Sequence, residues 1–289
     1  MEMKYRVTFS GFADEIDPSL EEQLRVLRDL HIPQMEIRGV DGKNITEYTL
    51  EETKEIARRL EEAEIGVSAV GSPLGKIKIT DDFETHMELF RHVVQQAKIL
   101  NTHNIRMFSF YIPQGEDPAQ YREEVLRRLK CFVECAREND IVLLHENEKG
   151  IYGDNAARCL DLFQELFGAH FRCTFDFANF VQCRQDTQEA FQMLKSYIDY
   201  VHVKDAQWED GKVVPAGQGD GHLLEILSQL DQRGYAGVLS LEPHLVDFAG
   251  LDALENGHKE EKEAASKGEA AFRLAFASLK ELLEKEAVK

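Results

Sequence analysis

Acidic, amide and imidazole side chains follow four apolar runs in the second half of the chain. These polar endings read HENE (145–148), DFAN (176–179), HVKD (202–205) and EPH (242–244). If the apolar runs are parallel β-strands of a barrel, their carboxyl ends meet at one face, where such barrels place their chemistry. The pattern therefore predicts one site, in which Glu146, Asp176, His202 and Glu242 surround a single divalent metal ion.

Three carboxylates with one imidazole form a mostly oxygen-donor set. Such a set favours Mn²⁺, Mg²⁺ or Co²⁺, and Zn²⁺ is also compatible with it, whereas a closed structural zinc site is rich in thiolate. Any one of these carboxylates could instead cap a strand or join a salt bridge. Four successive strands that end in this way favour the metal, because buried charges of one sign are costly unless a cation compensates them.

Further polar residues are spaced to face the same site. Glu36 and Arg38 lie two residues apart in an apolar run, so their side chains share one face of the predicted strand. Lys204 lies two residues after His202 and shares its face for the same reason. These three residues and Asn179 are candidates for binding substrate hydroxyls or a carboxylate. The alternative for Glu36, Arg38 and Lys204 is a buried ion pair.

The alternation of side chains along a strand also sorts their neighbours. His145 points away from Glu146 and is expected to be structural, whereas His244 is in register with Glu242 and could reach the site. Asp205 points away from the site and is expected to cap the loop that follows it.

The segment 207–221 (QWEDGKVVPAGQGDG) is long for a connection between a strand and a helix, and its turn residues predict a hairpin. Trp208 in this segment is expected to cover the substrate, or else to pack the hairpin. His222 follows the glycine-rich turn 215–221 and opens the next helix. A helix start of this kind can bind phosphate, although a tight turn explains the glycines equally well.

Eight β-branched or aromatic runs alternate with longer amphipathic ones along the chain, which is typical of βα units around a parallel sheet. The predicted strands are residues 6–12, 34–40, 66–71, 104–110, 141–146, 172–176, 200–204 and 237–242. Each precedes a run with apolar residues at three-to-four spacing, which predicts a helix. No linker interrupts the alternation, so we expect a single (β/α)8 TIM barrel domain over residues 1–289.

Helix starts and one connector complete the predicted organisation. Helix caps are expected at Asp17, Thr49, Asp117 and Asp154. Residues 246–267 are polar and rich in Glu and Lys, so they are expected to form a solvated connector before the last helix.

Composition limits the kind of partner. The chain has 289 residues, of which 43% are hydrophobic and 30% charged, as in water-soluble α/β proteins. Its formal net charge of −19 argues against a nucleic-acid partner, because that affinity depends on Lys and Arg neutralising phosphates. A small carbohydrate is the more compatible partner. Barrels of this kind often pair, so a homo-oligomer is also compatible with the sequence.

Cysteine usage and hydropathy bear on location. The five cysteines are odd in number and form no CxxC pair, so reduced thiols are expected. The N-terminus lacks a signal-peptide apolar segment, and no stretch is apolar enough to span a bilayer. The expected location is the cytoplasm, with no membrane partner.

The predicted strand ends and the loops after them carry motifs with a family resemblance. The motifs are FSGFADEI (9–16), MEIRGV (35–40), GSPLGKI (71–77), LLHENE (143–148), TFDFANF (174–180), YVHVKDA (200–206), PAGQGDG (215–221) and LSLEPH (239–244). Together they resemble the xylose isomerase-like TIM barrel superfamily, which includes sugar phosphate isomerases and epimerases, inosose dehydratases and endonuclease IV-like proteins. The resemblance covers nearly the whole chain. It implies that Glu146, Asp176, His202 and Glu242 hold the metal and that Glu146 and Glu242 act as acid and base.

The resemblance also implies a class of reaction. A metal-dependent isomerase or epimerase would act on a small sugar, sugar acid or sugar phosphate by proton transfer next to a carbonyl, through a metal-stabilised ene-diolate. Proton removal on one face and return on the other is epimerisation, and return to the adjacent carbon is isomerisation. The alternatives are an inosose-dehydratase-like lyase and a non-catalytic sugar-binding barrel.

The chain departs from family patterns at three positions. Many members have His three residues after the aspartate of the sixth strand, where this chain has Asn179. Ketose 3-epimerases have Glu and Arg at the places comparable to Tyr152 and Trp208. The substrate is therefore expected to be held differently from the free ketohexose of those enzymes. The endonuclease reading is disfavoured, since that branch uses extra histidines.

Overall fold

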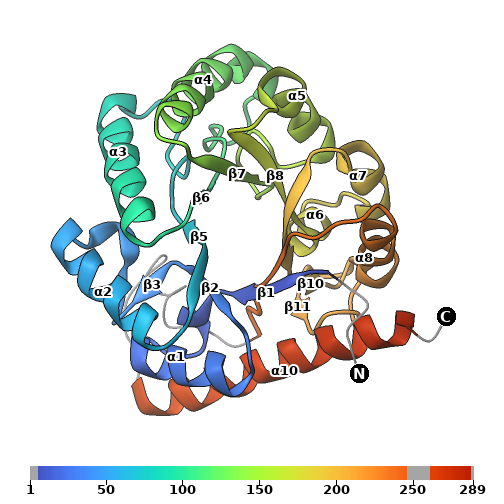
Figure 1. Cartoon of the computed structure of the whole chain (residues 1–289). Coiled ribbons are helices and arrows are strands. Elements are labelled where there is room, and N and C mark those ends of the chain that lie inside the picture. Colours follow the sequence, from blue (N-terminus) through green and yellow to red (C-terminus); the bar gives the residue numbers. More distant parts are fainter. Residues whose placement is uncertain (1–5, 246–260, 288–289) are drawn as a thin grey trace.

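Eight parallel strands form a barrel at the centre of the structure, a computed structural model that describes residues 6–245 and 261–287 (Figure 1). In chain order the strands are β1 (Thr8–Gly11), β2 (Gln34–Ile37), β5 (Gly66–Gly71), β6 (Asn104–Met107), β7 (Val142–Glu146), β8 (Phe171–Asp176), β9 (Ile198–Val203) and β12 (Val238–Leu241). Parallel ladders join them in the order β1-β12-β9-β8-β7-β6-β5-β2, and β1 lies beside β2. The predicted (β/α)8 TIM barrel is therefore confirmed.

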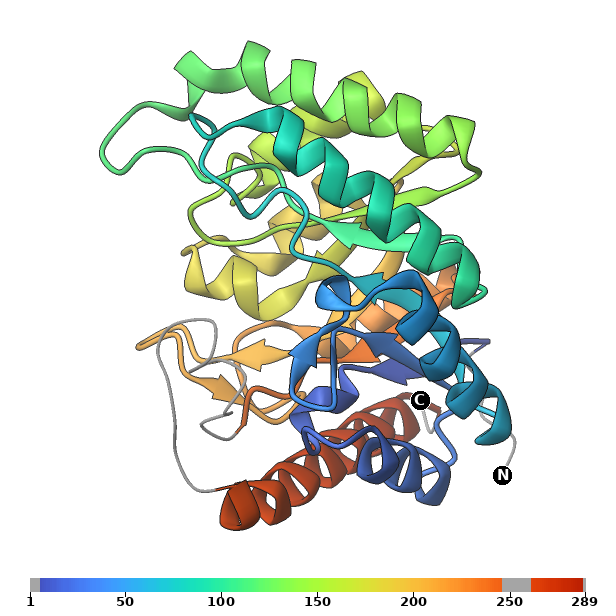
Figure 2. The ribbon, with the colours of Figure 1, turned by 90° about the vertical axis from the view of Figure 1, so that its left-hand side faces the viewer.

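Helices surround this barrel on its outside, and Figure 2 shows them from the side. The main helices are α1 (Leu20–Asp29), α2 (Leu50–Glu62), α3 (Phe83–Ile99), α4 (Arg122–Glu138), α5 (Ala156–Leu166), α7 (Thr187–Leu194), α8 (Leu223–Gln232) and α10 (Glu261–Ala287), with a short α6 (Phe177–Gln182) directly after β8. Their apolar faces supply the core, as where the fully buried rings of Phe90 and Phe132 meet with centroids 4.9 Å apart. Burial of such aromatic side chains stabilises the fold strongly.

Two predicted strands are shorter than expected. The strand predicted at 34–40 ends at Ile37, because β3 (Gly39–Val40) leaves the barrel and pairs antiparallel with β4 (Lys43–Asn44). The strand predicted at 104–110 ends at Met107, and Phe110 has a positive φ of 66° that a strand does not tolerate. Apolar character continued beyond both strands because these loops are buried.

The predicted helix caps are partly correct. Thr49 caps α2 by accepting from the N–H of Glu52, and Asp117 caps a short 3-10 turn (Pro118–Tyr121) before α4. The predictions at Asp17 and Asp154 are wrong, since Ser19 precedes α1 and Asn155 precedes α5. Acidic side chains one or two residues upstream are taken by other partners, as where Asp17 accepts from the N–H of Ser19 at 2.8 Å.

The C-terminal helix α10 packs along the outside of the barrel beside α1 (Figure 1). Phe276 meets Phe9 of β1 edge to face with ring centroids 5.2 Å apart, and Arg25 of α1 pairs with Glu269 at 2.6 Å. The predicted connector 246–267 is wrong for its last part, because 261–267 already belong to α10. A helix rich in Glu and Lys has the same polar composition as a connector. Residues 246–260 lie outside the described residues.

Two observations bear on the predicted class of protein. All five cysteines are free thiols, as expected. None of the helices within 6–245 and 261–287 is long and apolar enough to cross a membrane.

The loop after β5 is held in place by a buried histidine. Gly75 in this loop has a φ of +82°, and a Cβ there would lie 2.0 Å from the carbonyl oxygen of Phe108, so only glycine fits. Its N–H donates to Nε2 of His86 on α3 at 2.8 Å. Burial and, to a smaller extent, nearby Arg128 together lower the pKa of His86 to about 4. The neutral imidazole is therefore the form that fixes this loop.

We predict that His86 makes the fold sensitive to acid. Its pKa in the folded protein is about 4, below the ordinary value of about 6.5 that it regains on unfolding. The stabilising effect is therefore complete above about pH 6.5 and is lost as the pH falls towards 4, up to about 3 kcal/mol. Thermal unfolding of His86→Gln, which keeps an acceptor but does not titrate, should lose less Tm than the wild type over this range. The exposed His103→Gln is the matched control, and parallel Tm curves for wild type and His86→Gln would contradict the role of His86.

Candidate metal centre

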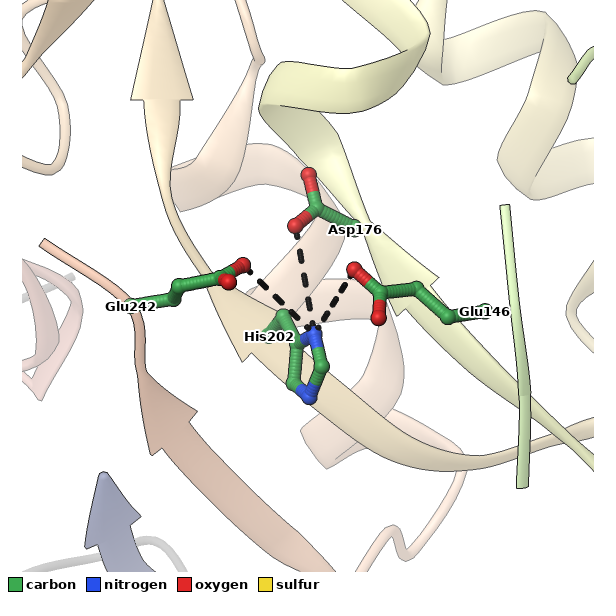
Figure 3. Close-up of side chains that lie close together, drawn as sticks. All are labelled: Glu146, Asp176, His202 and Glu242. Carbon is green, nitrogen blue, oxygen red and sulfur yellow. Dashed lines mark ion pairs between the residues drawn. The ribbon is translucent and has the colours of Figure 1, made fainter. Parts of the chain in front are cut away.

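Four side chains from four neighbouring strands meet at the carboxyl end of the barrel. Glu146 ends β7, Asp176 ends β8, His202 lies in β9 and Glu242 follows β12. One possible ligand atom from each lies within 4.8 Å of the other three, and all four residues are buried. Figure 3 shows the three carboxylates arranged around Nδ1 of His202, which lies 3.1 Å from Glu146, 3.8 Å from Glu242 and 3.9 Å from Asp176. The structure thus brings together the four residues predicted as ligands.

The strand register explains why they meet. Asp176 is the direct ladder partner of His202, and Leu241, just before Glu242, is the partner of Val203. Because β7, β8, β9 and β12 are consecutive in the sheet, side chains at their ends point into one space.

The donor set fits a divalent metal ion. Asp176 Oδ2 and His202 Nδ1 are both buried and make no hydrogen bond within the described structure, although buried polar atoms normally have a partner. Both atoms face the carboxylates of Glu146 and Glu242. A cation bound by the four residues would contact both atoms, in addition to the Lys204 ammonium 3.0 Å from Asp176 Oδ2, and would compensate the carboxylates. This buried cluster could therefore hold a metal such as Mn²⁺, Mg²⁺, Co²⁺ or Zn²⁺.

The carboxylates differ in how well the protein compensates them. Burial raises the pKa of Glu146, but His202 and Arg106 lower it by more, to about 2. Burial raises the pKa of Asp176 to about 7, with Lys204 opposing the shift. Asp176 is thus the ligand with the greatest need of another positive charge.

Below the four ligands, Glu36 supports His202. Its carboxylate is 0% exposed, and Oε2 lies 3.0 Å from Nε2 of His202. The same oxygen accepts from the hydroxyls of Tyr200 at 3.0 Å and Ser240 at 2.7 Å. Because a carboxylate only accepts, Nε2 of His202 must carry the proton, which directs the Nδ1 lone pair at the other ligands. The inward direction predicted for Glu36 is correct, and it lies beneath the ligands as a buried partner.

Lys204 and Arg38 lie above the ligands, on the predicted face. Lys204 Nζ contacts Glu242 Oε2 at 2.7 Å and Asp176 Oδ2 at 3.0 Å. Arg38 binds Asp14 through two nitrogens at 2.8 and 3.2 Å and lies 3.3 Å from Glu242 Oε1. Both of the predicted alternatives, ion pair and substrate contact, remain compatible with these positions.

Of the other residues predicted to bind substrate, one contacts the four clustered residues and two have other contacts or are exposed. Asn179 donates to Glu146 Oε1 at 3.1 Å and so touches the ligand set directly. His222 Nδ1 instead lies 3.1 Å from the hydroxyl of Thr187, and Trp208 is 41% exposed on the loop that joins β10 (Asp205–Ala206) to β11 (Val213–Val214). The hairpin predicted in this segment is confirmed, since β10 and β11 pair antiparallel. The structural roles expected for His145 and Asp205 also agree with their contacts.

His145 and Asp205 point away from the ligands. The His145 ring packs against Phe163 and Phe171, with centroids 5.9 and 5.8 Å away. Asp205 accepts from the backbone N–H groups of the glycine-rich turn 215–221, at Gly217, Gly219 and Gly221, over 2.9 to 3.0 Å. The prediction that this turn could bind phosphate is therefore corrected, because these amides donate to a carboxylate of the protein itself.

Sequence reasoning missed Arg106 of β6. Its Nε lies 3.3 Å from Glu146 Oε2 and 3.8 Å from Glu36 Oε1, and the side chain is almost fully buried. The available signal was a single charge flanked by Ile105 and Met107 in an otherwise apolar strand. A buried arginine of this kind needs carboxylate partners, which the barrel interior supplies.

Comparison with known proteins identifies the family of barrels to which the chain is similar. The family model described as xylose isomerase-like TIM barrel matches residues 24–282. Among curated proteins, the chain is 22% identical to the 3-dehydroshikimate dehydratase of Bacillus anthracis, over 61% of this chain and 62% of that protein. The match therefore spans less than two thirds of that relative.

Two solved structures illustrate the shared fold. The IOLI protein with a bound zinc atom superposes with a TM-score of 0.74 at 15% identity, covering 96% of this chain and 99% of that one. An L-ribulose 3-epimerase superposes with a TM-score of 0.71 at 16% identity, covering 98% and 97%. At these identities the likeness concerns the fold alone.

We predict that Glu36→Gln weakens metal binding without unfolding the barrel. The amide cannot act as the anionic partner of the His202 imidazole, and loss of such a partner costs roughly 10- to 100-fold in metal affinity. Titration with Mn²⁺, followed by calorimetry and by the electron paramagnetic resonance signal of free Mn²⁺, measures this directly. Glu134→Gln, an exposed carboxylate on α4 that pairs with Arg137, is the matched control. Wild-type affinity in a folded Glu36→Gln protein would show that Glu36 does not orient the ligand.

Proposed function

Because this chain belongs to the xylose isomerase-like TIM barrel family, we propose that it is a divalent-metal-dependent isomerase or epimerase. It would act on a small carbohydrate by moving a proton next to a carbonyl. The observation that carries the proposal is the buried set of Glu146, Asp176, His202 and Glu242, in which two glutamates approach one space from different strands.

The four residues would hold the metal. When bound, a divalent ion supplies Lewis-acid polarisation of a carbonyl and an adjacent hydroxyl, which makes the neighbouring C–H bond more acidic. His202 contributes Nδ1 because Glu36 holds its other nitrogen.

The two glutamates are suited to proton transfer. In Figure 3 they enter from opposite sides of His202. Each has one oxygen in the ligand cluster and the other beside an arginine, with Glu146 Oε2 3.3 Å from Arg106 and Glu242 Oε1 3.3 Å from Arg38. Burial raises the pKa of Glu242, but Lys204 and His244 hold it well below its usual value. Both glutamates are therefore ionised at neutral pH and ready to accept a proton.

A carbon placed between the glutamates would have a carboxylate on each face. Inversion would need one glutamate to take the proton from one face and the other, after taking a proton from solvent, to deliver it to the opposite face. Return of the removed proton from the first glutamate to the adjacent carbon would instead move the carbonyl. The Lys204 ammonium, 2.7 Å from Glu242 Oε2, would donate to oxygen atoms that gain negative charge. Asn179 would orient Glu146 through the contact of 3.1 Å.

A lyase is the second candidate, and the similarity to 3-dehydroshikimate dehydratase favours it. The same first step, removal of a proton next to a carbonyl, leads to elimination if an acid protonates a hydroxyl on the next carbon. The product would then carry a carbon–carbon double bond conjugated to the carbonyl.

We predict that solvent deuterium enters the substrate carbon next to the carbonyl. The Mn²⁺-loaded protein should be incubated in D₂O with D-fructose, D-tagatose, scyllo-inosose and their charged analogues, and followed by NMR. Exchange with retention of the carbon skeleton and of every hydroxyl supports the isomerase or epimerase. A new conjugated carbonyl chromophore supports the lyase, and the absence of both supports a non-catalytic sugar-binding barrel.

We predict that Glu242→Gln lowers the rate of this exchange by at least about 100-fold, because loss of a positioned base costs this much or more. Metal content has to be measured alongside, since Glu242 is also a ligand in the proposal. Glu134→Gln, at an exposed carboxylate on α4 that pairs with Arg137, is the matched control and should retain exchange. Full exchange by metal-loaded Glu242→Gln would remove Glu242 from the proton transfer.

A further inference from the structure

The positive side chains around the metal ligands are already matched by carboxylates. Lys204 lies within 3.0 Å of both Asp176 and Glu242. With one divalent ion in place, the three ligand carboxylates would be balanced by the metal and Lys204 together, since His202 coordinates as a neutral imidazole. Together the metal and Lys204 would neutralise the three carboxylates, so no positive charge would remain for an anionic substrate.

The same pairing extends to the residues around the ligands, called the rim here: Asp14, Glu15, Arg38, Lys76, Glu148 and His244. Arg38 lies 2.8 Å from Asp14 and 3.3 Å from Glu15, and His244 lies 3.2 Å from Glu15. Both also lie 3.3 Å from Glu242, whose charge is already counted with the metal and Lys204. On the other side Lys76 Nζ lies 3.1 Å from Glu148 and over the ring of Phe108, 4.3 Å from its centroid. Arg106 lies between Glu36 and Glu146.

The glycine-rich turn after β11 is also filled. The glycine-rich turn 215–221 offers the kind of converging N–H groups that bind phosphate. Three of these groups donate to Asp205, which also accepts from Ala206 at 2.9 Å. An incoming phosphate would have to displace this buried carboxylate.

We infer that the substrate of this site is an uncharged polyhydroxy ketone, and that phosphate esters and carboxylic acids are disfavoured. This inference rests on the proposed function. A ligand with hydroxyl groups donates to the many carboxylate oxygens of the rim, which only accept. An anionic ligand meets the same oxygens with like charge, and it would have to share each arginine or lysine of the described rim with a carboxylate that already pairs with it.

Binding to matched pairs tests the inference. The probes for the Mn²⁺-loaded protein are D-fructose with D-fructose 6-phosphate and D-fructuronate, and scyllo-inosose with 3-dehydroshikimate, titrated by calorimetry at fixed ionic strength. The uncharged member of each set should bind at least tenfold more tightly. Tighter binding of any charged member than of its uncharged partner would overturn the inference, and so would failure of every uncharged member to bind.

A rim variant tests the cause. Glu148→Gln removes the carboxylate partner of Lys76, so it should reduce the penalty against D-fructose 6-phosphate, measured as the ratio of its Kd to that of D-fructose, at least fivefold. Glu134→Gln makes the same change in net charge at an exposed pair on α4 and should leave the penalty unchanged. An identical penalty in both variants would overturn the rim pairing as the source of selectivity.

Isotope exchange separates this inference from the proposed function. An uncharged ketone that binds but never exchanges its C–H proton would sink the proposed proton transfer and leave the substrate class standing. A phosphate ester that binds more tightly than its uncharged partner and exchanges would uphold the proton transfer and overturn the substrate class.

Discussion

Three carboxylates buried in one barrel mouth repel one another, and the arrangement of the surrounding side chains depends on compensating that repulsion. The compensation is uneven. His202 and Arg106 outweigh burial at Glu146, whose pKa falls to about 2, whereas burial dominates at Asp176, whose pKa rises to about 7 despite Lys204. Asp176 Oδ2 and His202 Nδ1, which make no hydrogen bond within the described structure, lie where compensation is incomplete. A metal ion would therefore act where the protein's own charges fall short.

The barrel makes this concentration of charge possible because it fixes the ligands from below. Glu36 is held by Tyr200 and Ser240, and Tyr200 in turn contacts Ser68, 2.8 Å away, across the barrel interior. The Glu36 contact therefore holds the His202 ring with Nδ1 turned towards the three carboxylates before any ligand arrives. Such preorganisation removes the cost of ordering the donors at the moment of binding or reaction.

Side-chain alternation and strand ends were enough to predict the barrel and its four neighbouring polar strand ends, because both depend on local geometry. The position of a side chain along the barrel axis was not predictable in this way. Glu36 and Arg38 share a face, yet Glu36 lies beneath His202 and Arg38 lies at the rim. Loop residues were harder still, as Trp208 and His222 make their contacts through a hairpin and a turn whose path is set by Asp205. Arg106 was not predicted, because a single charge in an apolar strand does not by itself indicate a role. Its role depends on Glu36 and Glu146, which only the fold brings beside it.

The metal ligands by themselves do not select a reaction, since barrels of this fold include proteins described as epimerases and as a dehydratase. Selection has to come from the side chains around the ligands, which decide what a substrate meets first. Here those side chains form closed ion pairs, from Arg38 with Asp14 on one side to Lys76 with Glu148 on the other. In such an ion pair the carboxylate can still accept a hydrogen bond from a ligand, whereas the cation is already bound to the carboxylate. We therefore expect the pair to favour ligands with hydroxyl groups over anions. In the proposed function, opening one pair by a single substitution would change which ligands are accepted without altering the four proposed metal ligands, so selectivity and proton transfer would depend on different side chains of the same barrel mouth.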